Sequence, residues 1–482
     1  MTNTAPVDGK ATLIRNIAWL VAYDAEGDAQ TYRQGADIAF IGDRFVDPAS
    51  LTKEEIGETI DGSDMLVVPG FIDVHAHPGF ETMIKGLTEE VGSPQFYMSS
   101  LYEYLYLFDT TEAGMRASTK VALSELMQSG VTTIVDISTP HEGWVDVLAQ
   151  SGMRAYAAPM FRDGKWYTDN GREVKYAWDT QAGAARMAAA LAPVDAAVAH
   201  ASGRLGGMVV PAQIDTVSPD LFIAAGEEAR KRGLTIQTHA SQSVVDFTEI
   251  QRRHGKTPVG WLESLGLLGP DMIIGHGIFL DHNDWLSWPD RRDLGLLAET
   301  GTHVAHCPTV FMRRGITMQD VGSYMRAGIN IGIGTDTYPH NFIEEMRNGI
   351  YAARIAKRDV RTVAARDMIT AATLGGAKML GRTDIGRIAP GAKADFFIVD
   401  LKHPSMRPVY DPIRSLIYSS GERAVRETWV DGRRIVKDGK CQTFNIEEAI
   451  DEVEAAQRAS VKEIQKWDWD RRPADVLMPK SF

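Results

Sequence analysis

The chain has 482 residues, of which 44% are hydrophobic and 24% charged, as is usual for a globular protein. Its 51 basic and 64 acidic side chains leave a formal charge of −13, which disfavours sequence-independent binding to nucleic acid. The chain has two cysteines, so a disulfide framework is excluded, as is any metal site that needs four thiolates from this chain.

The sequence predicts neither a targeting segment nor a membrane span. The N-terminus lacks the basic-then-apolar layout of a signal peptide, and no apolar run approaches the roughly 20 residues needed to cross a bilayer. We therefore expect a cytoplasmic protein with no nucleic-acid or membrane partner. We also expect a homodimer or a higher homo-oligomer.

Both ends of the chain are predicted to be rich in β-strands. Strand-like patterns cover residues 11–23 and 38–46 near the N-terminus, and 394–400 and 425–436 near the C-terminus. Asp431-Gly432 is typical of a hairpin turn between two apolar runs. Residues 1–64 and 385–445 are therefore expected to form one small domain, with the middle of the chain inserted between them.

The middle of the chain, residues 65–384, alternates short apolar runs with helical stretches. Candidate helices cover 112–129, 219–232 and 251–267. The apolar runs are residues 65–74, 131–137, 153–160, 207–214, 234–238, 272–274, 302–305 and 329–334. Strands that alternate with helices predict a parallel α/β architecture, and the presence of eight favours a (β/α)8 TIM barrel.

Two further segments differ from this alternation. Residues 77–111 follow the first apolar run and contain the aromatic side chains Phe80, Phe96, Tyr97, Tyr102, Tyr104, Tyr106 and Phe108. A segment this long is either a lid that lines the binding site or a helix whose aromatic side chains cover the barrel. Residues 446–482 are predicted to form a charged amphipathic helix, over 446–464, and a short tail.

The run that ends in His75 and His77 carries the strongest chemical signal. In a strand, residues i and i+2 point to the same face, so these two imidazoles form half of a metal site. His239, His276 and Asp336 end three later runs in the same way. Because active sites lie at the C-terminal ends of barrel strands, these side chains are expected to meet there.

These residues and the motifs around them resemble the amidohydrolase superfamily, most closely its cytosine/guanine deaminase and triazine hydrolase branch. The motifs are PGFIDVHAH at 69–77, GHGIFLD at 275–281, AHCP at 305–308, GIGTD at 332–336, NFIEEMR at 341–347 and IGRIAPGAKADFFIVD at 385–400. The resemblance implies a distorted (β/α)8 barrel over residues 65–384. It also implies a small β-sandwich built from residues 1–64 and 385–445, followed by the helix and tail at 446–482.

The resemblance also implies a ligand set. A metal ion is expected to be held by His75, His77, His239 and Asp336, while His276 orients the attacking water. Asp336 can accept the proton of that water as general base, and His276 can hydrogen-bond to the developing oxyanion. Three imidazoles and one carboxylate suit zinc, iron or manganese, and zinc is expected.

One metal ion is expected rather than two. Many relatives bridge two metals with a carboxylated lysine on strand four, but residues 206–216 contain neither lysine nor glutamate. The nearest lysines, Lys175 and Lys231, lie well outside that run. A single divalent ion per chain follows.

Two departures from the branch pattern concern the substrate pocket. The glutamate that usually lies three residues after the strand-five histidine is here Gln242, which can hydrogen-bond but cannot transfer protons. After the HCP motif, Val310 and Phe311 are more apolar than the usual residues, so the pocket is expected to be more apolar. The residues expected to contact substrate are Gln242, His306, Thr337, Phe80 and Phe96.

The predicted function is hydrolysis, by a metal-activated water, of a non-peptide C–N bond at an sp² carbon of a small heterocyclic, cyclic amide or urea-like substrate. Three alternatives remain open. The first is deamination of an N-heterocycle, with another group in place of the missing glutamate. The second is displacement of halide or sulfur from a ring. The third is a catalytically inactive scaffold on the same fold, against which the complete ligand set argues.

Overall fold

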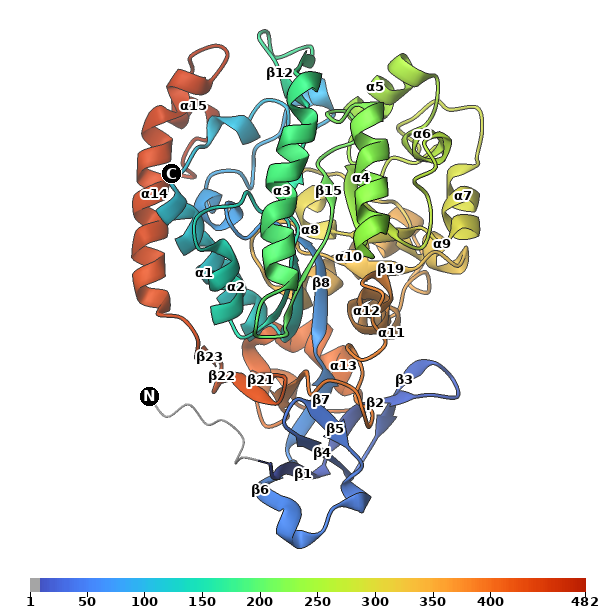
Figure 1. Cartoon of the computed structure of the whole chain (residues 1–482), viewed down its shortest axis with the longest axis vertical. Coiled ribbons are helices and arrows are strands. Elements are labelled where there is room, and N and C mark those ends of the chain that lie inside the picture. Colours follow the sequence, from blue (N-terminus) through green and yellow to red (C-terminus); the bar gives the residue numbers. More distant parts are fainter. Residues whose placement is uncertain (1–8) are drawn as a thin grey trace.

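The computed structural model describes residues 9–482, and its central part is an α/β structure with two parallel sheets of four strands each (Figure 1). One sheet has the strand order β14-β10-β9-β8 and the other β16-β17-β18-β19. Isolated bridges join Ala76 to Asp336 and Val209 to Ile236, so each edge of one sheet meets an edge of the other. The strands are β8 (Phe71–Ala76), β9 (Val131–Asp136), β10 (Arg154–Ala157), β14 (Leu205–Gly207), β16 (Ile236–Ala240), β17 (Met272–His276), β18 (His303–His306) and β19 (Ile331–Ile333).

Helices alternate with these strands along the chain. They are α1 (Glu112–Gln128), α2 (Trp144–Gln150), α3 (Gly183–Val198), α4 (Pro219–Arg232), α5 (Val244–His254), α6 (Pro258–Ser264), α7 (Asp293–Thr300), α8 (Pro308–Met312), α9 (Val321–Arg326), α10 (Phe342–Lys357), α11 (Ala365–Thr370) and α12 (Gly376–Met379). The predicted helix at 219–232 is confirmed. Ser218 caps α4 by accepting a hydrogen bond from Leu221, and Gly233, with a φ of +65°, ends it.

The single helix predicted over 251–267 is wrong, because two helices share that stretch. Helix α5 ends at His254, and Gly255 takes a left-handed conformation with a φ of +65°. Thr257 then caps α6, with Pro258 in its first turn. Gly255 therefore ends one helix, and Thr257 and Pro258 begin the next, although the helical pattern of the sequence continues across them.

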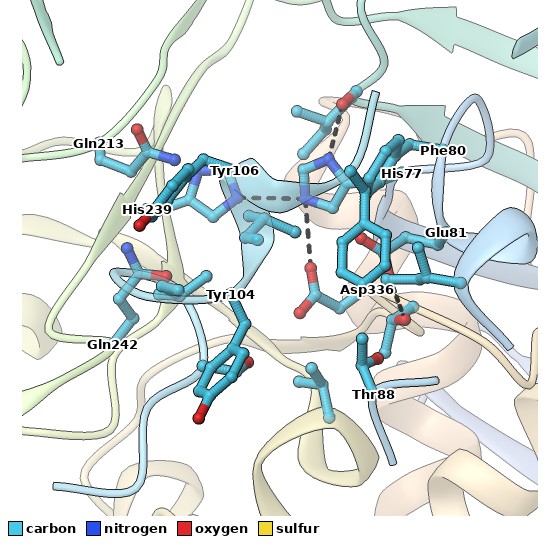
Figure 2. A pocket seen from close by; sticks show the side chains of 18 of the residues that line it. His77, Phe80, Glu81, Thr88, Tyr104, Tyr106, Gln213, His239, Gln242 and Asp336 are labelled. Carbon is cyan, nitrogen blue, oxygen red and sulfur yellow. Dashed lines mark hydrogen bonds and ion pairs between the residues drawn. The ribbon is translucent and has the colours of Figure 1, made fainter. Parts of the chain in front are cut away.

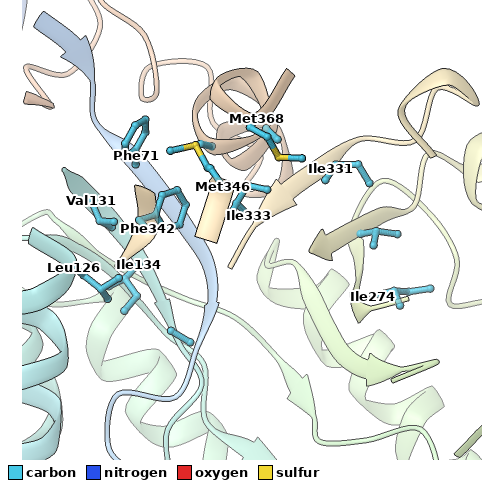
Figure 3. Packing of buried hydrophobic residues seen from close by; sticks show 14 of the residues in the cluster. Phe71, Leu126, Val131, Ile134, Ile274, Ile331, Ile333, Phe342, Met346 and Met368 are labelled. Atoms are coloured by element: carbon cyan, nitrogen blue, oxygen red, sulfur yellow. The ribbon is translucent and has the colours of Figure 1, made fainter. Parts of the chain in front are cut away.

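Buried side chains hold β8 in place beneath the site. Phe71 of β8 stacks on Phe342 of α10, with ring centroids 5.5 Å apart, and Figure 3 shows Val131 of β9 and Leu126 of α1 in the same cluster. All six residues of β8 are buried. This packing fixes the strand that carries His75.

Strands from the two ends of the chain pair with each other. A sheet with the order β23-β22-β21-β20-β7-β2-β3 combines N-terminal and C-terminal strands, and Val68 of β7 pairs with Phe397 of β20. A second sheet has the order β5-β4-β1-β6, and both sheets contribute to one buried cluster that includes Phe40 and Trp429. The strands are β1 (Ala11–Ile17), β2 (Trp19–Asp24), β3 (Ala29–Arg33), β4 (Ala36–Ile41), β5 (Arg44–Val46), β6 (Ile56–Asp61), β7 (Met65–Pro69), β20 (Phe396–Asp400), β21 (Val425–Val430), β22 (Arg433–Lys437) and β23 (Lys440–Cys441).

The segment 77–111 forms turns and three short 3-10 helices, Glu81–Ile84, Pro94–Phe96 and Leu105–Leu107, rather than a covering α-helix. Near it lie the hairpin of β12 (Gly164–Tyr167) and β13 (Lys175–Trp178) and the long helix α14 (Ile446–Trp467), which packs along α1 (Figure 1). The short strands β11 (Met160–Phe161) and β15 (Val210–Pro211) pair with each other, and α13 (Pro412–Ser415) and α15 (Ala474–Leu477) complete the helices. Over residues 9–482, no helix combines the length and apolar character needed to cross a membrane.

Candidate metal centre and active site

Three histidines and one aspartate meet at the C-terminal ends of the central strands. His75 and His77 come from the end of β8, His239 comes from β16, and Asp336 follows β19. Asp336 Oδ1 lies 3.3 Å from His75 Nε2. It lies 3.2 Å from His77 Nε2, which in turn lies 3.2 Å from His239 Nε2 (Figure 2). The four ligand atoms all lie within 4.8 Å of one another.

Each histidine is oriented by a hydrogen bond at its other ring nitrogen. The Nδ1 atoms of His75, His77 and His239 lie 2.5 Å from Gln237 Oε1, 2.7 Å from the carbonyl of Ile137 and 2.6 Å from the carbonyl of Ala212. An imidazole that donates from Nδ1 carries its lone pair on Nε2, so three lone pairs face the Asp336 carboxylate.

This donor set fits a divalent metal ion. Nε2 of His75 is buried and has no hydrogen-bond partner, and the ligand atoms of His77, His239 and Asp336 lie within 4.8 Å of it. Lone pairs and a carboxylate that converge in this way repel one another unless a cation lies between them. Imidazole nitrogen and carboxylate oxygen are ligands preferred by zinc and neighbouring transition metals.

The backbone at Asp336 is strained into the position that the site requires. Asp336 has a φ of +60°, in the left-handed region, a conformation that costs about 1–3 kcal/mol for such a residue. Its N–H donates to the carbonyl of His75 at 2.8 Å, and the N–H of His77 donates to the carbonyl of Asp336 at 3.2 Å. These two bonds lock the turn after β19 onto the end of β8.

Burial and neighbouring charges set the protonation states. Burial opposes ionisation of Asp336, but the imidazoles of His276, His75 and His77 outweigh it and hold the pKa of the carboxyl well below its ordinary value. Burial lowers the pKa of His276 to about 3. Burial, followed by repulsion from His75, lowers the pKa of His239 well below its ordinary value. Burial opposes protonation of His77, but the hydrogen bond and charge of Asp336 outweigh it and raise the pKa of this imidazole. The site therefore combines an ionised carboxylate at Asp336 with two neutral imidazoles, those of His239 and His276.

A cavity of about 340 Å³ opens above these side chains. His77, His239, His276 and Asp336 form its polar end. Its apolar walls come largely from the segment 77–111, through Phe80, Tyr104, Tyr106 and Phe108. Four of the seven aromatic residues in that segment therefore line the cavity, which matches the lid alternative.

The residues predicted to contact substrate are distributed between this cavity and the surrounding core. Gln242, Thr337 and Phe80 line the cavity, and Nε2 of Gln242 is buried without a hydrogen-bond partner. Phe96 instead packs against Tyr102, with ring centroids 5.9 Å apart. His306 is a buried residue at the end of β18 and is not among the residues that line the cavity.

Sequence reasoning missed two polar residues at the site. Gln237 holds His75, and the strand period could have identified it, since it lies two residues before His239 on the same face of β16. Glu81 lines the cavity and accepts a hydrogen bond from the Thr337 hydroxyl. Burial raises the pKa of the Glu81 carboxyl.

Comparisons with known proteins agree with this geometry. Residues 66–435 match the Amidohydrolase family. The chain is 30% identical over 391 residues to a 5-methylthioadenosine/S-adenosylhomocysteine deaminase of Natronomonas pharaonis, an alignment that covers 80% of this chain and 85% of the relative. An adenosine deaminase of Xanthomonas campestris with bound zinc has a TM-score of 0.78 at 20% identity, covering 96% of this chain and 100% of the other. An atrazine chlorohydrolase of Arthrobacter aurescens complexed with zinc has a TM-score of 0.75 at 20% identity, covering 92% and 100%.

The fold and the donor set define a hydrolase with a site for a divalent metal ion. The chain belongs to the amidohydrolase family, which confirms the superfamily indicated by its motifs. It is accordingly an enzyme that hydrolyses carbon–nitrogen bonds other than peptide bonds.

Proposed function

We propose that the chain uses one zinc ion to hydrolyse a non-peptide C–N bond at an sp² carbon of a small heterocyclic, cyclic amide or urea-like substrate. The observation that carries this proposal is the convergence of four ligand atoms at the polar end of a largely apolar cavity. A cavity of about 340 Å³ suits a small planar molecule. When bound, a divalent metal lowers the pKa of water so that hydroxide is available near neutral pH.

The protein side chains have separate roles in this reaction. The ionised Asp336 accepts the proton of the attacking water at its carboxylate, and it can return that proton to the leaving nitrogen. Neutral His276 donates a hydrogen bond to the oxygen on which negative charge develops. Gln242 binds a polar group of the substrate, because its amide cannot exchange protons. Phe80 and Thr337 complete the substrate contacts.

The architecture proposed for this activity is a distorted (β/α)8 barrel with a β-sandwich. The bridges between the edges of the two parallel sheets support closure of the barrel, and the shared cluster of the two terminal sheets supports the sandwich. We propose the domain ranges 1–64, 65–384, 385–445 and 446–482, although β7 at the start of the second range pairs with the terminal sheet. Cytoplasmic location and homo-oligomeric assembly stay predictions.

Deamination of a purine-like ring is the second candidate. The curated relatives are named as deaminases of adenosine derivatives, which favours it. Gln242 argues against it, because deamination requires proton transfer to the ring and to the leaving amine. Displacement of a ring substituent is a further alternative, supported by the structural similarity to an atrazine chlorohydrolase.

A substrate panel with four readouts distinguishes these reactions. The full-length chain, loaded with zinc, is incubated with ureas, cyclic amides, adenosine derivatives and halogenated or thioalkyl triazines, and amine or ring-opened acid, ammonia, halide and alkanethiol are measured. The proposal expects amine or ring opening, whereas ammonia or halide would assign one of the alternatives. His239→Ala serves as the metal-free control and should be inactive on every compound. Turnover that survives in His239→Ala would contradict the metal-dependent mechanism.

A further inference from the structure

Helix α14 contacts the segment 77–111, which forms most of the apolar wall of the cavity and is called the wall segment below. Gln457 of α14 donates from its side-chain amide to the carbonyl of Met83 at 2.7 Å and to that of Lys85 at 2.9 Å. Ser460 of the same helix accepts a hydrogen bond from the N–H of Asp109 at 3.2 Å. Helix α14 thus satisfies backbone groups near both ends of the wall segment, which has little regular structure to satisfy them internally.

Apolar contacts follow the same path. Val453 and Ile464 of α14 are buried in one cluster with Ile84 and Phe108 of the wall segment. Both of these wall residues line the cavity. The buried face of α14 therefore lies directly behind side chains that face the substrate.

A second contact is centred on Glu103, a buried carboxylate in the middle of the wall segment. Its Oε1 accepts hydrogen bonds from Trp469 Nε1 at 3.0 Å and from Arg472 at 2.7 Å, while Oε2 accepts one from Ser93 at 2.5 Å. The ring of Trp469 also lies against Gly171 of the β12–β13 hairpin, where an added Cβ would come within 2.6 Å of it. The tail after α14 thus connects the wall segment to the hairpin beside it.

We propose that residues 446–472 position the substrate-binding wall of the cavity, with Gln457, Glu103 and Arg472 as the positioning residues. This inference rests on the proposed function, in that the wall is taken to bind the substrate. None of the three residues lines the cavity, so each acts through the wall rather than on the substrate. Disturbing them should weaken substrate binding while the metal centre and the chemical step stay intact.

The test compares variants of the full-length, zinc-loaded enzyme. Gln457→Leu removes the two bonds to the wall backbone, and Arg472→Ala removes the charge that faces Glu103. The matched control is Arg458→Ala, next to Gln457 on α14, where an exposed arginine pairs with Glu454 at 3.1 Å on its own helix. We expect about a tenfold rise in KM for the first two variants, with kcat and zinc content within about twofold of wild type. Arg458→Ala should match wild type, and Arg472→Lys should recover part of the loss.

Hydrogen exchange provides a second readout that needs no substrate. Amides in residues 80–108 should exchange faster in Gln457→Leu and Arg472→Ala than in Arg458→Ala. Unchanged exchange of these amides would overturn the inference. An activity that falls in proportion to zinc content while KM stays constant would also overturn it, because that result indicates a merely structural role. If Gln457→Leu fails to fold, Arg472→Lys gives the same comparison with a milder change. If wild type turns over no compound of the panel, the proposed function fails while exchange still decides this inference.

Discussion

The orientation of His75, the most deeply buried of the four candidate metal ligands, depends on one side chain. Gln237 accepts the hydrogen bond of His75 Nδ1, and its own amide donates to the carbonyl of Val74 at 3.2 Å. Gln237→Leu removes the acceptor and leaves the imidazole free to rotate or change tautomer. We expect zinc affinity to fall roughly 10- to 100-fold, as is typical when an outer partner of a ligand is lost. Competition with a chelator measures it. Gln213→Leu is the matched control, because the side chain of this buried glutamine accepts a hydrogen bond from Thr216 and only its backbone pairs with His239. An equal loss of zinc affinity in Gln213→Leu would contradict a specific role of Gln237.

Gln242 and Asp336 face the same cavity but should respond differently to truncation. Gln242→Ala removes one neutral hydrogen bond, a loss of about 0.5–1.5 kcal/mol, or about tenfold in rate at most. Asp336→Ala removes both a ligand and the general base, so activity should be close to zero. Steady-state kinetics on the true substrate, with zinc content measured in parallel, compares them. If Gln242→Ala is as inactive as Asp336→Ala while folded and zinc-loaded, the assignment of binding to Gln242 is wrong.

The clustering of the four candidate metal ligands could be predicted from sequence, because each lies at or just beyond the end of a strand. Strand period and the position of strand ends are local properties, so His75, His77, His239 and Asp336 could be grouped without a structure. Phe96 shows the limit of that reasoning. Its proximity in sequence to the ligands suggested a pocket residue, but the turns of the wall segment direct it toward Tyr102 and away from the cavity.

At the scale of elements, the capping box at the start of α5 contains a carboxyl group, that of Asp246, with a raised pKa. Asp246 accepts hydrogen bonds from the N–H groups of Gln242 and Ser243, yet burial and then the charge of Asp215 raise its pKa to about 7. The folded state therefore holds a proton that the unfolded state releases near pH 4. The resulting stability is present below about pH 4 and is lost as pH rises toward 7.

Asp246→Asn should flatten this part of the pH dependence, because an amide does not titrate. The expected result is a smaller fall in the free energy of unfolding between about pH 4 and 7 than in wild type. Urea denaturation at fixed zinc concentration measures it, and the difference between variants cancels the pH dependence of metal binding. Asp220→Asn, in the first turn of α4, should follow wild type. If the free energy of unfolding of Asp246→Asn fell with pH as steeply as that of wild type, Asp246 would not be the source of the pH dependence.

A helix could be predicted correctly where the sequence shows both a helical hydrophobic period and residues that cap the two ends. Ser218, Pro219 and Gly233 define α4 in sequence and in structure. Over 251–267 the helical period continues through Gly255, and only the backbone conformation there reveals that α5 and α6 are separate. In the segment 77–111, aromatic side chains indicated burial without specifying a period, so its 3-10 turns could not be predicted.

At the scale of the whole molecule, one buried ionic cluster joins the terminal sheets to the central strands. Arg154 of β10 is 1% exposed and contacts Asp395 at 3.0 Å and Asp431 at 2.6 Å. Arg154→Leu leaves the buried carboxylate of Asp395 without its cationic partner, whereas Asp431 keeps Lys393 at 3.7 Å. We expect a loss of about 3–5 kcal/mol in the free energy of unfolding. Chemical denaturation measures this loss.

The control for this prediction is Arg232→Leu. Arg232 also pairs with two carboxylates, Asp195 and Glu228, but it lies near the surface at the end of α4. Its replacement should cost about 1 kcal/mol or less, because solvent screens exposed ion pairs. Equal losses in the two variants would show that burial does not determine the contribution of Arg154.

Contacts between distant parts of the chain were the least predictable. The sequence predicted an amphipathic helix at 446–464 and placed it outside the other predicted domains. No pattern in the sequence indicated which segment the apolar face of this helix packs against. The bond between Glu103 and Arg472 joins residues that no local pattern relates. Such a pair becomes visible only when both segments are placed in three dimensions.

The pairing of the chain ends also determines when the protein can fold. Strand β7 has Val68 opposite Phe397, so the terminal sheet stays incomplete on the ribosome until the nascent chain has emerged past β20. The central strands, which pair with near neighbours, are synthesised first and can assemble earlier. Closing so long a loop is slow, and meanwhile β7 exposes one unpaired apolar edge, the edge that later pairs with β20. Premature termination between residues 337 and 395 should therefore yield an aggregation-prone chain, even though all four candidate metal ligands have already been translated.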